Sequence, residues 1–382
     1  MMRRVIVHIG MGKTGSSSIQ QTLRRGLADP AFRYAGFGGT SHSRSVYSLF
    51  SDSPEAFHGH RKRGWGKEEI ERFNIATRER IIQDFKACKA STVIISGEGI
   101  GNLEEAGLRR FREFLADHFE EIVVVGYVRP PRSYMGSTFQ QGIKGCHNRL
   151  NLKGLYPKYR KRFKKFDLIF GPENVHLWKF DPKSFPQGDV VLDFCRRLGI
   201  DMRPEALRRA NESISKEAVS LLFAYRKFGP GYGVGLDAVQ ANRRLIAALR
   251  TIGSGKLRFA PEVVRPVLDA NCEDIQWMEE RLGESLTESL QGSDDDVRSE
   301  TDLLRIHPST VEDLKGLLGE EFLPEGIKGE TPQEVAQLVH ALRVKLAEEA
   351  EEREPKGIRK KAATAERAGG AGHGKCHHPH QA

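Results

Sequence analysis

The segment of residues 5–18 constrains the fold of this chain more than any other. Residues 5–9 form a short apolar run, and glycines follow at positions 10, 12 and 15. Residues 16–26 then carry a helical pattern. The spacing predicts a buried strand, a glycine-rich turn and a helix. Backbone N–H groups, the positive end of the helix, three hydroxyls and the ammonium of Lys13 would converge there on a bound anion.

Two phosphate-binding patterns fit this turn in part. The three glycines satisfy the G-x-G-x-x-G spacing of a dinucleotide fingerprint, but Asp29, at the distance of the ribose-binding carboxylate, follows no second apolar strand. In the P-loop pattern G-x-x-x-x-G-K-[ST], Gly10 and Gly15 fit. Ser16 stands at the lysine position, however, and the lysine lies earlier, at Lys13. The turn is therefore P-loop-like, with a lysine that meets the anion from a different part of the loop.

Composition narrows the class of protein. The chain has 382 residues and a formal net charge of +9, which favours phosphorylated or polyanionic partners. Lys and Arg are spread along the chain without zinc-finger or helix-turn-helix spacing, so we expect no nucleic-acid binding. The five cysteines lack C-x-x-C spacing and indicate reduced thiols in a cytoplasmic protein. No apolar run reaches the roughly 18 residues of a transmembrane helix, and peripheral membrane contact stays open.

Short apolar runs alternate with helical patterns along the first half of the chain. This alternation predicts an α/β fold: a three-layer parallel sheet with the P-loop-like loop at its edge and helical C-terminal additions. Besides residues 5–9, the predicted strands are residues 92–96, 122–127 and 175–180. Predicted helices cover residues 104–119 and 189–198, and Gly199 suits the left-handed cap of the second.

Turn-rich segments predict the organisation of the chain. Residues 36–66 read as a long loop, rich in Gly, Ser, His and Arg, and residues 229–235 as a glycine-rich break. We expect one α/β domain over residues 1–290, an acidic linker over 291–300 with solvated aspartates, and a helical extension over 301–352. Residues 353–382 are basic and poor in apolar residues, which predicts a disordered tail. The tail could capture metal ions in vitro, but no metal is expected to be required; its potential ligands are His373, Cys376, His377, His378 and His380.

The end of the strand at residues 122–127 supplies a second anion-binding group. Arg129 follows this strand directly, two prolines end the strand after it, and Ser137 lies about two helical turns further on. In an open α/β sheet, ligands bind at the carboxyl edge of the strands. A guanidinium pairs bidentately with phosphate oxygens. Arg129 and Ser137 are thus expected to hold one phosphate near Lys13.

On these two segments the chain resembles the family of sulfotransferases that use 3′-phosphoadenosine 5′-phosphosulfate (PAPS). The family motif K-[ST]-G-[ST]-[ST] matches residues 13–17, and its arginine and serine eight residues apart match Arg129 and Ser137. Residues 188–199 and 211–213 look like elements of bacterial members. The tryptophan that often follows the loop is replaced by Ser18-Ile19-Gln20, which is closer to carbohydrate-type members. The resemblance covers roughly residues 3–290.

The resemblance implies roles for individual residues. Lys13 would stabilise and protonate the leaving oxygen of the donor, and Arg129 and Ser137 would hold the 3′-phosphate. The 5′-phosphate would contact the rest of the loop, namely Thr14, Gly15, Ser16, Ser17 and Ser18. The acceptor would be a hydroxyl of a carbohydrate or glycolipid, and the transfer would proceed in line without a metal.

A base for the acceptor hydroxyl has two candidates. Glu98 directly follows the strand at residues 92–96 and opens toward the same edge as Lys13, so it comes first. His42, in the predicted long loop, is the rival, since its intrinsic pKa suits a base. Residues 153–165 interleave Lys and Arg with apolar residues, which indicates either a solvated amphipathic helix or a surface for an acidic glycan or the nucleotide.

Two further function classes stay open from the sequence. One is a phosphotransferase with a variant P-loop. The other is a nucleotide-binding protein without catalytic activity, whose basic tail serves as an interaction arm.

Overall fold

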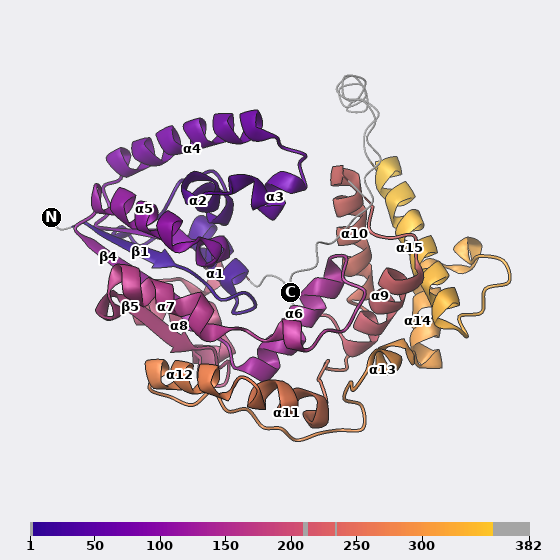
Figure 1. Cartoon of the computed structure of the whole chain (residues 1–382). Coiled ribbons are helices and arrows are strands. Elements are labelled where there is room, and N and C mark those ends of the chain that lie inside the picture. The colour runs from indigo at the N-terminus through magenta and orange to yellow at the C-terminus, as the bar shows by residue number, and fades with distance from the viewer. Residues whose placement is uncertain (1–2, 209–212, 234, 354–382) are drawn as a thin grey trace.

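The computed structural model describes residues 3–208, 213–233 and 235–353 (Figure 1). Its centre is a sheet of parallel strands in the order β2-β3-β1-β4-β5. The strands are β1 (Arg4–His8), β2 (Phe32–Tyr34), β3 (Thr92–Ser96), β4 (Glu121–Val128) and β5 (Val175–Lys179). The predicted α/β class with a parallel sheet is confirmed.

Helices cover both faces of the sheet and make it the middle of three layers. On one face, α1 (Ser16–Gly26) and α8 (Val190–Leu198) pack against Ile6 of β1. Val5 and Val7 point to the other face, because side chains alternate along a strand. Four helices cover that face: α2 (Ser43–Phe50), α4 (Lys67–Ala87), α5 (Glu105–Ala116) and α7 (Tyr159–Phe170).

The helix predicted over residues 189–198 shows how local sequence sets its ends. Asp189 is the N-cap of α8, and its carboxylate accepts a hydrogen bond of 2.7 Å from the Val191 amide. Gly199 closes the helix with a φ of 68°, which is the left-handed conformation that favours glycine. The Gly199 cap was correctly predicted from the sequence, whereas Asp189 was predicted as the first residue of the helix and is its N-cap.

The part of the fold beyond β3 differs from the sequence prediction in two places. Strand β2 was missed, because it has only three residues. Residues 36–66 are not one long loop: they contain α2 and the short helix α3 (His58–Arg61). Val46 and Phe50, four residues apart, bury one side of α2, and this spacing was hidden by the polar residues around it.

A second lobe of helices lies beside the α/β lobe, and α6 (Pro131–Lys144) leads from β4 into it (Figure 1). There α15 packs against α9, α10 and α14. Its longer helices are α9 (Lys216–Phe228), α10 (Gly235–Leu249), α14 (Pro308–Leu318) and α15 (Pro332–Arg353), and α13 (Glu300–Leu304) is short. Two more helices, α11 (Pro261–Asp269) and α12 (Cys272–Leu282), return toward the sheet, where α12 contacts α7 and β5.

The segment predicted as an acidic linker is packed against the protein. Val297 is buried and pairs with residues 258–260 through its amide and carbonyl. Asp296 is only 4 % exposed and lies 3.5 Å from the Arg132 guanidinium, whereas its two acidic neighbours are exposed. The expectation of three solvated aspartates was therefore wrong for Asp296, which a nearby cation stabilises in a buried position.

Several sequence predictions fall on the chain ends and gaps. The tail and its histidines lie beyond residue 353, and Asn211 and Glu212 are also outside the described residues. Within the described ranges, no helix is both long and apolar enough to cross a membrane. The four cysteines in these ranges are free thiols: Cys88, Cys146, Cys195 and Cys272.

The packing of α15 predicts that residues 301–353 contribute to the stability of the whole fold. Leu338 is 0 % exposed in a core cluster that continues from the helical lobe into the α/β lobe. Leu338→Ala is expected to lower the free energy of unfolding by about 2–5 kcal/mol in urea denaturation, because it leaves a cavity. Val344→Ala, at a position 42 % exposed on the same helix, should change it by about 0.5 kcal/mol or less. Equal effects of the two variants would contradict the packing.

Candidate functional site

The loop between β1 and α1 has the geometry of an anion-binding turn. Gly10, Lys13 and Gly15 have positive φ values of 32°, 73° and 76°. Gly15 is the N-cap of α1, and the first turn of this helix contains no acidic residue. A Cβ at Gly15 would lie 2.5 Å from Val190 Cγ1, so only glycine fits there. Such a turn directs backbone N–H groups toward the space beyond the helix N-terminus.

The hydroxyl groups of the loop have different surroundings. Thr14 is fully buried, and its hydroxyl donates to the Met11 carbonyl at 2.6 Å. It therefore holds the loop in shape. Ser16 is also buried, but its Oγ has no hydrogen bond of normal geometry. Ser17 and Ser18 are half-buried in the first turn of α1. Ser16 is thus the hydroxyl best suited to a ligand, since a buried hydroxyl gains most from a partner.

Lys13 lies between the loop and α6. Its ammonium donates to Gln141 Oε1 at 3.0 Å, and its backbone carbonyl accepts a 2.6 Å hydrogen bond from Arg129 Nη1. Burial lowers the pKa of Lys13, Glu98 opposes this effect, and the Arg129 guanidinium adds to it. Arg129 and the loop are therefore joined directly, although 116 residues separate them in the chain.

Arg129 is fixed at the end of β4 by its surroundings. Its Nε donates to Ser133 Oγ at 3.2 Å, and its carbonyl accepts from the Tyr159 hydroxyl at 2.6 Å. The guanidinium carbon lies 5.4 Å from the centre of the Phe180 ring. Burial lowers the pKa of Arg129, and the Glu288 carboxylate raises it in part.

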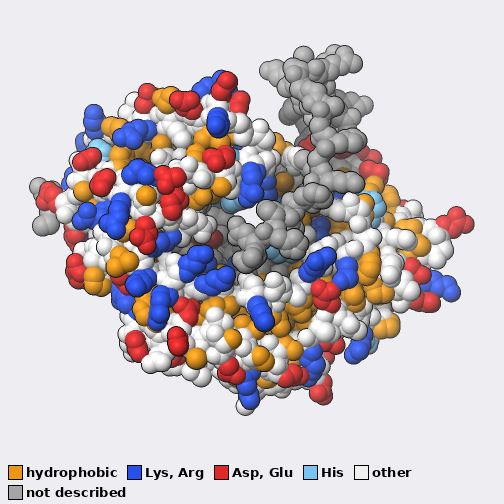
Figure 2. Space-filling model, viewed as in Figure 1, with side chains coloured by type: hydrophobic (Ala, Val, Ile, Leu, Met, Phe, Trp, Pro, Cys, Tyr) orange, Lys and Arg blue, Asp and Glu red, His pale blue; other side chains and the backbone are white. Residues whose placement is uncertain are grey.

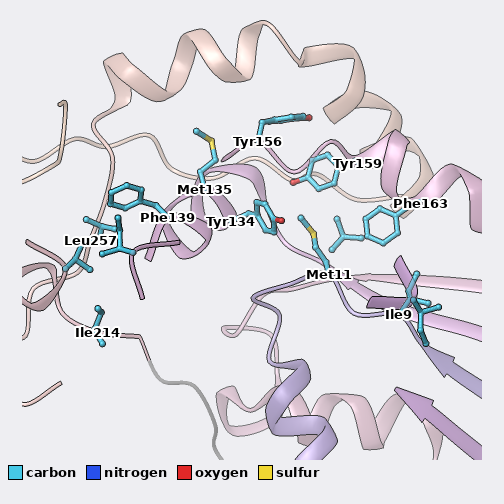
Figure 3. Close-up of a cluster of buried hydrophobic side chains, with 14 of the residues drawn as sticks. Ile9, Met11, Tyr134, Met135, Phe139, Tyr156, Tyr159, Phe163, Ile214 and Leu257 are labelled. Carbon is cyan, nitrogen blue, oxygen red and sulfur yellow. The ribbon is translucent and has the colours of Figure 1, made fainter. Parts of the chain in front are cut away.

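A cluster of buried apolar side chains packs against the loop and α6. Figure 3 shows Ile9 and Met11 beside Tyr134, Tyr159 and Phe163, which come from α6 and α7. Met11 Sδ also accepts a hydrogen bond of 3.4 Å from the Arg129 amide. The loop is thereby packed against the helices that carry the other site residues.

A cavity of about 940 Å³ opens beside Arg129. Arg129 and Ser137 both line it, but residues 10–18 do not belong to its wall. Among the described residues, seven basic ones line this cavity: Arg129, Arg132, Lys179, Lys183, Arg250, Lys256 and Arg258. In the described part of the chain, its acidic lining residues are Asp181 and Glu288. Several Lys and Arg side chains also gather on the face shown in Figure 2. The excess of positive charge favours an anionic ligand.

Glu98 lies against the loop from the β3 side. A Cβ built on Gly10 would be 3.3 Å from Glu98 Cγ, and one on Gly12 would be 3.9 Å from its Oε2. Burial raises the pKa of Glu98, while Ser16, Lys13 and Arg162 lower it in part. Glu98 is thus a half-buried carboxylate whose charged form is stabilised by neighbouring groups.

His42 does not join this group of residues. It is fully buried before α2, with its ring 4.6 Å from the Tyr34 ring and 4.7 Å from that of Phe37. Its Nδ1 accepts a 3.0 Å hydrogen bond from the Ser96 amide. Burial lowers the pKa of His42 to about 3. A neutral, enclosed imidazole in this place has no open path to an acceptor, so the geometry disfavours His42 as the base.

Three residues near the site were missed in the sequence. Gln141 follows Ser137 by four residues, so helical spacing could have placed it on the same face of α6. Arg162 and Lys165 lie in the basic stretch of residues 153–165. Lys165 donates to the carbonyls of residues 101 and 103 at 2.8 and 2.5 Å and supports the turn that follows Glu98. Neither alternative weighed for this stretch, a solvated helix or a ligand surface, included that structural role.

Comparisons with known proteins give limited similarity. No protein-family profile matches the chain. An uncharacterized protein of Archaeoglobus fulgidus is 34 % identical over 128 residues, which cover 32 % of this chain and 35 % of that protein. The chain thus matches about a third of the length of this relative.

Two solved structures align over more of the chain. A sulfotransferase from Alicyclobacillus acidocaldarius aligns with a TM-score of 0.36 and 17 % identity, over 59 % of this chain and 93 % of that one. The sulfotransferase domain from the curacin biosynthetic pathway aligns with a TM-score of 0.28 and 13 % identity, over 56 % and 79 % of the two chains. Similarities of this size do not assign a function.

Proposed function

We propose that this protein transfers a sulfuryl group from PAPS to a hydroxyl group of an acceptor. The observation that carries the proposal is the hydrogen bond from Arg129 to the Lys13 carbonyl, which joins two cationic anion-binding elements at adjacent strand ends. A donor with two separate phosphate positions requires two such elements. The sequence resemblance to PAPS-dependent sulfotransferases supports the same conclusion.

The donor would contact both elements. The amides after Gly15 and the hydroxyls of Ser16, Ser17 and Ser18 would hold the 5′-phosphate at the N-terminus of α1. Arg129 and Ser137 would hold the 3′-phosphate where they line the basic cavity. The cavity volume of about 940 Å³ is within the range of small-molecule sites, and the 5′-phosphate would lie outside this cavity, because residues 10–18 do not line it. Thr14, whose hydroxyl is bonded to Met11, would contribute through its backbone only.

Lys13 would act on the bond that breaks. As the S–O bond to the bridging oxygen lengthens, negative charge develops on that oxygen, and a nearby ammonium stabilises it. Lys13 then gives this oxygen a proton. Its lowered pKa makes the proton easier to transfer than that of a solvent-exposed lysine.

Glu98 would act on the bond that forms. It takes the proton of the acceptor hydroxyl while the acceptor oxygen bonds to sulfur, so one proton is accepted here and one is released by Lys13. Burial raises the pKa of Glu98, which makes it a stronger base than an exposed glutamate. The structure favours Glu98 over His42 because only Glu98 lies against the loop.

The acceptor class comes from the resemblance to carbohydrate-type and bacterial sulfotransferases. We infer a carbohydrate or glycolipid hydroxyl and a cytoplasmic protein, with the catalytic residues in the α/β part of the chain. A screen of such acceptors with labelled PAPS identifies the substrate.

Donor binding tests the two-element site. Titration calorimetry should show that 3′-phosphoadenosine 5′-phosphate, titrated without metal, binds more tightly than ATP titrated with Mg²⁺. Arg129→Gln should weaken its binding by about 10²-fold, because a bidentate charged contact is lost. The affinity for AMP, which lacks the 3′-phosphate, should change less than threefold and serves as a control for loop integrity. A preference for Mg-ATP would instead support a phosphotransferase.

Substitution of Lys13 distinguishes an enzyme from a nucleotide-binding protein without catalytic activity. Lys13→Ala is expected to lower kcat for sulfuryl transfer by about 10²–10³-fold, since the leaving oxygen loses its cation. Turnover is measured with labelled PAPS and an acceptor from the screen. Lys164→Ala, which removes an exposed lysine of α7, should leave turnover unchanged. The same negligible turnover before and after Lys13→Ala would indicate a protein without catalytic activity.

The pH dependence of kcat tests Glu98. A base must be deprotonated, so kcat should rise with pH through the pKa of Glu98, which burial places above its ordinary value of 4.5. Glu98→Gln should lower kcat by about 10²-fold and remove this rise. Glu113→Gln, on the exposed side of α5, is the control and should retain both. An unchanged pH profile in Glu98→Gln would assign the rise to another group.

A further inference from the structure

The position of Glu98 depends on two flanking glycines. Gly97 is extended, with a φ of −169°, and a Cβ there would lie 2.6 Å from the Ser43 amide nitrogen. A Cβ on Gly99 would lie 2.8 Å from Ser43 Cβ. The backbone on both sides of Glu98 therefore packs directly against residues 42 and 43, at the start of α2, with no room for a larger residue.

Hydrogen bonds hold the same contact. The His42 amide donates to the Ser96 carbonyl at 2.8 Å, and the Ser96 amide donates to His42 Nδ1 at 3.0 Å. Next to them, the Gly99 amide donates to Ser43 Oγ at 2.9 Å. Two residues of the α2 N-terminus thus fix the backbone on either side of Glu98.

The state of the His42 ring is set by this arrangement. Because Nδ1 accepts a hydrogen bond from an amide, the imidazole is neutral and its proton is on Nε2. The ring is fully buried between Tyr34 and Phe37, which hold its plane. An apolar ring of the same size would fill the space but leave the Ser96 amide without its acceptor.

We propose that His42 is a positioning residue for Glu98: its neutral Nδ1 and its amide fix the end of β3 so that the Glu98 carboxylate lies against the loop that carries Lys13. The proposal rests on the sulfotransferase function and on Glu98 as its base. His42 would act by bonding the backbone of Ser96 and would not transfer a proton.

Other groups complete the surroundings of Glu98. Ser16 and Lys13 face it from the loop and α1, and Arg162 faces it from α7. Lys165 supports the far end of the turn through the carbonyls of residues 101 and 103. At the near end, His42 bonds the Ser96 amide, while His8 Nδ1 and Gln20 Nε2 lie 2.8 and 3.2 Å from the Ser96 hydroxyl. Loss of His42 should therefore displace Glu98 without removing any group that binds the donor.

Substitution of His42 separates positioning from general stability. His42→Phe should lower kcat by about 10–50-fold and leave the KM for PAPS within twofold. His42→Asn, whose Oδ1 can accept from the Ser96 amide, should recover most of kcat. In a Glu98→Gln background, His42→Phe should lower the residual rate by less than twofold, because it acts through Glu98.

His60→Phe is a matched control. His60 is also fully buried among aromatic rings, with Nδ1 bonded to the Pro54 carbonyl. Its ring contacts are with Phe57, Trp65 and Phe73, away from residues 96–99. It should leave kcat within twofold of the wild type. The proposal would be overturned if His42→Phe lowered kcat as much in the Glu98→Gln background as in the wild type. It would also be overturned if His60→Phe lowered kcat as much as His42→Phe does. If His42→Phe does not fold, Ser43→Ala, which removes the acceptor of the Gly99 amide, should show the same selective loss of kcat.

A measurement without turnover separates this inference from the proposed function. The Glu98 carboxyl is titrated by NMR in the ligand-free protein with labelled glutamate, and Glu98→Gln assigns its signal. In His42→Phe the pKa of Glu98 should fall toward its ordinary value, because the carboxylate becomes more exposed to water. An unchanged pKa refutes the positioning function. Absence of sulfuryl transfer by the wild-type protein refutes the proposed function, whatever the titration shows.

Discussion

The parallel pairing of β1 between β3 and β4 is the constraint on which the rest of this structure depends. Val7 pairs with Ile95 on one side and with Val124 on the other. The carboxyl ends of three neighbouring strands therefore meet at one edge, as ligand sites in open α/β sheets require. Lys13 follows β1, Glu98 follows β3 and Arg129 follows β4. No one of these segments forms a site alone, and their order in the sheet places the lysine between the carboxylate and the guanidinium.

Charge is concentrated at this edge at a cost in solvation. Burial lowers the pKa values of Lys13 and Arg129, and it lowers that of Lys144 to about 8, to which the charges of Lys13 and Arg250 also contribute. Like charges held together in a partly buried site repel one another, and a multiply charged anion relieves this repulsion. The protein thus maintains a strained arrangement of charges that is complementary to the proposed donor. Glu98 provides a partial counter-charge beside Lys13.

Local sequence rules predicted the elements with clear periodicity and caps. Strand β3 and helix α1 begin and end where expected, and Asp189 and Gly199 close α8 as their residue types predict. The same rules failed for β2, which is too short for a pattern, and for α2, whose two buried apolar residues lie in a polar segment. They also failed for Lys165, because a lysine that caps carbonyls of a distant turn has the same local sequence as a solvated one.

The sequence by itself determined the phosphate-binding character of residues 10–18, because glycine conformation and a helix N-terminus are properties of neighbouring residues. It also placed Arg129 and Glu98 after strands, and thereby at the same edge of a parallel sheet. Only the tertiary structure decided that Arg129 bonds the Lys13 carbonyl, that Glu98 lies against Gly10, and that His42 is enclosed beneath them. These contacts join residues 54 to 116 positions apart, and the order of strands and the packing of helices create them.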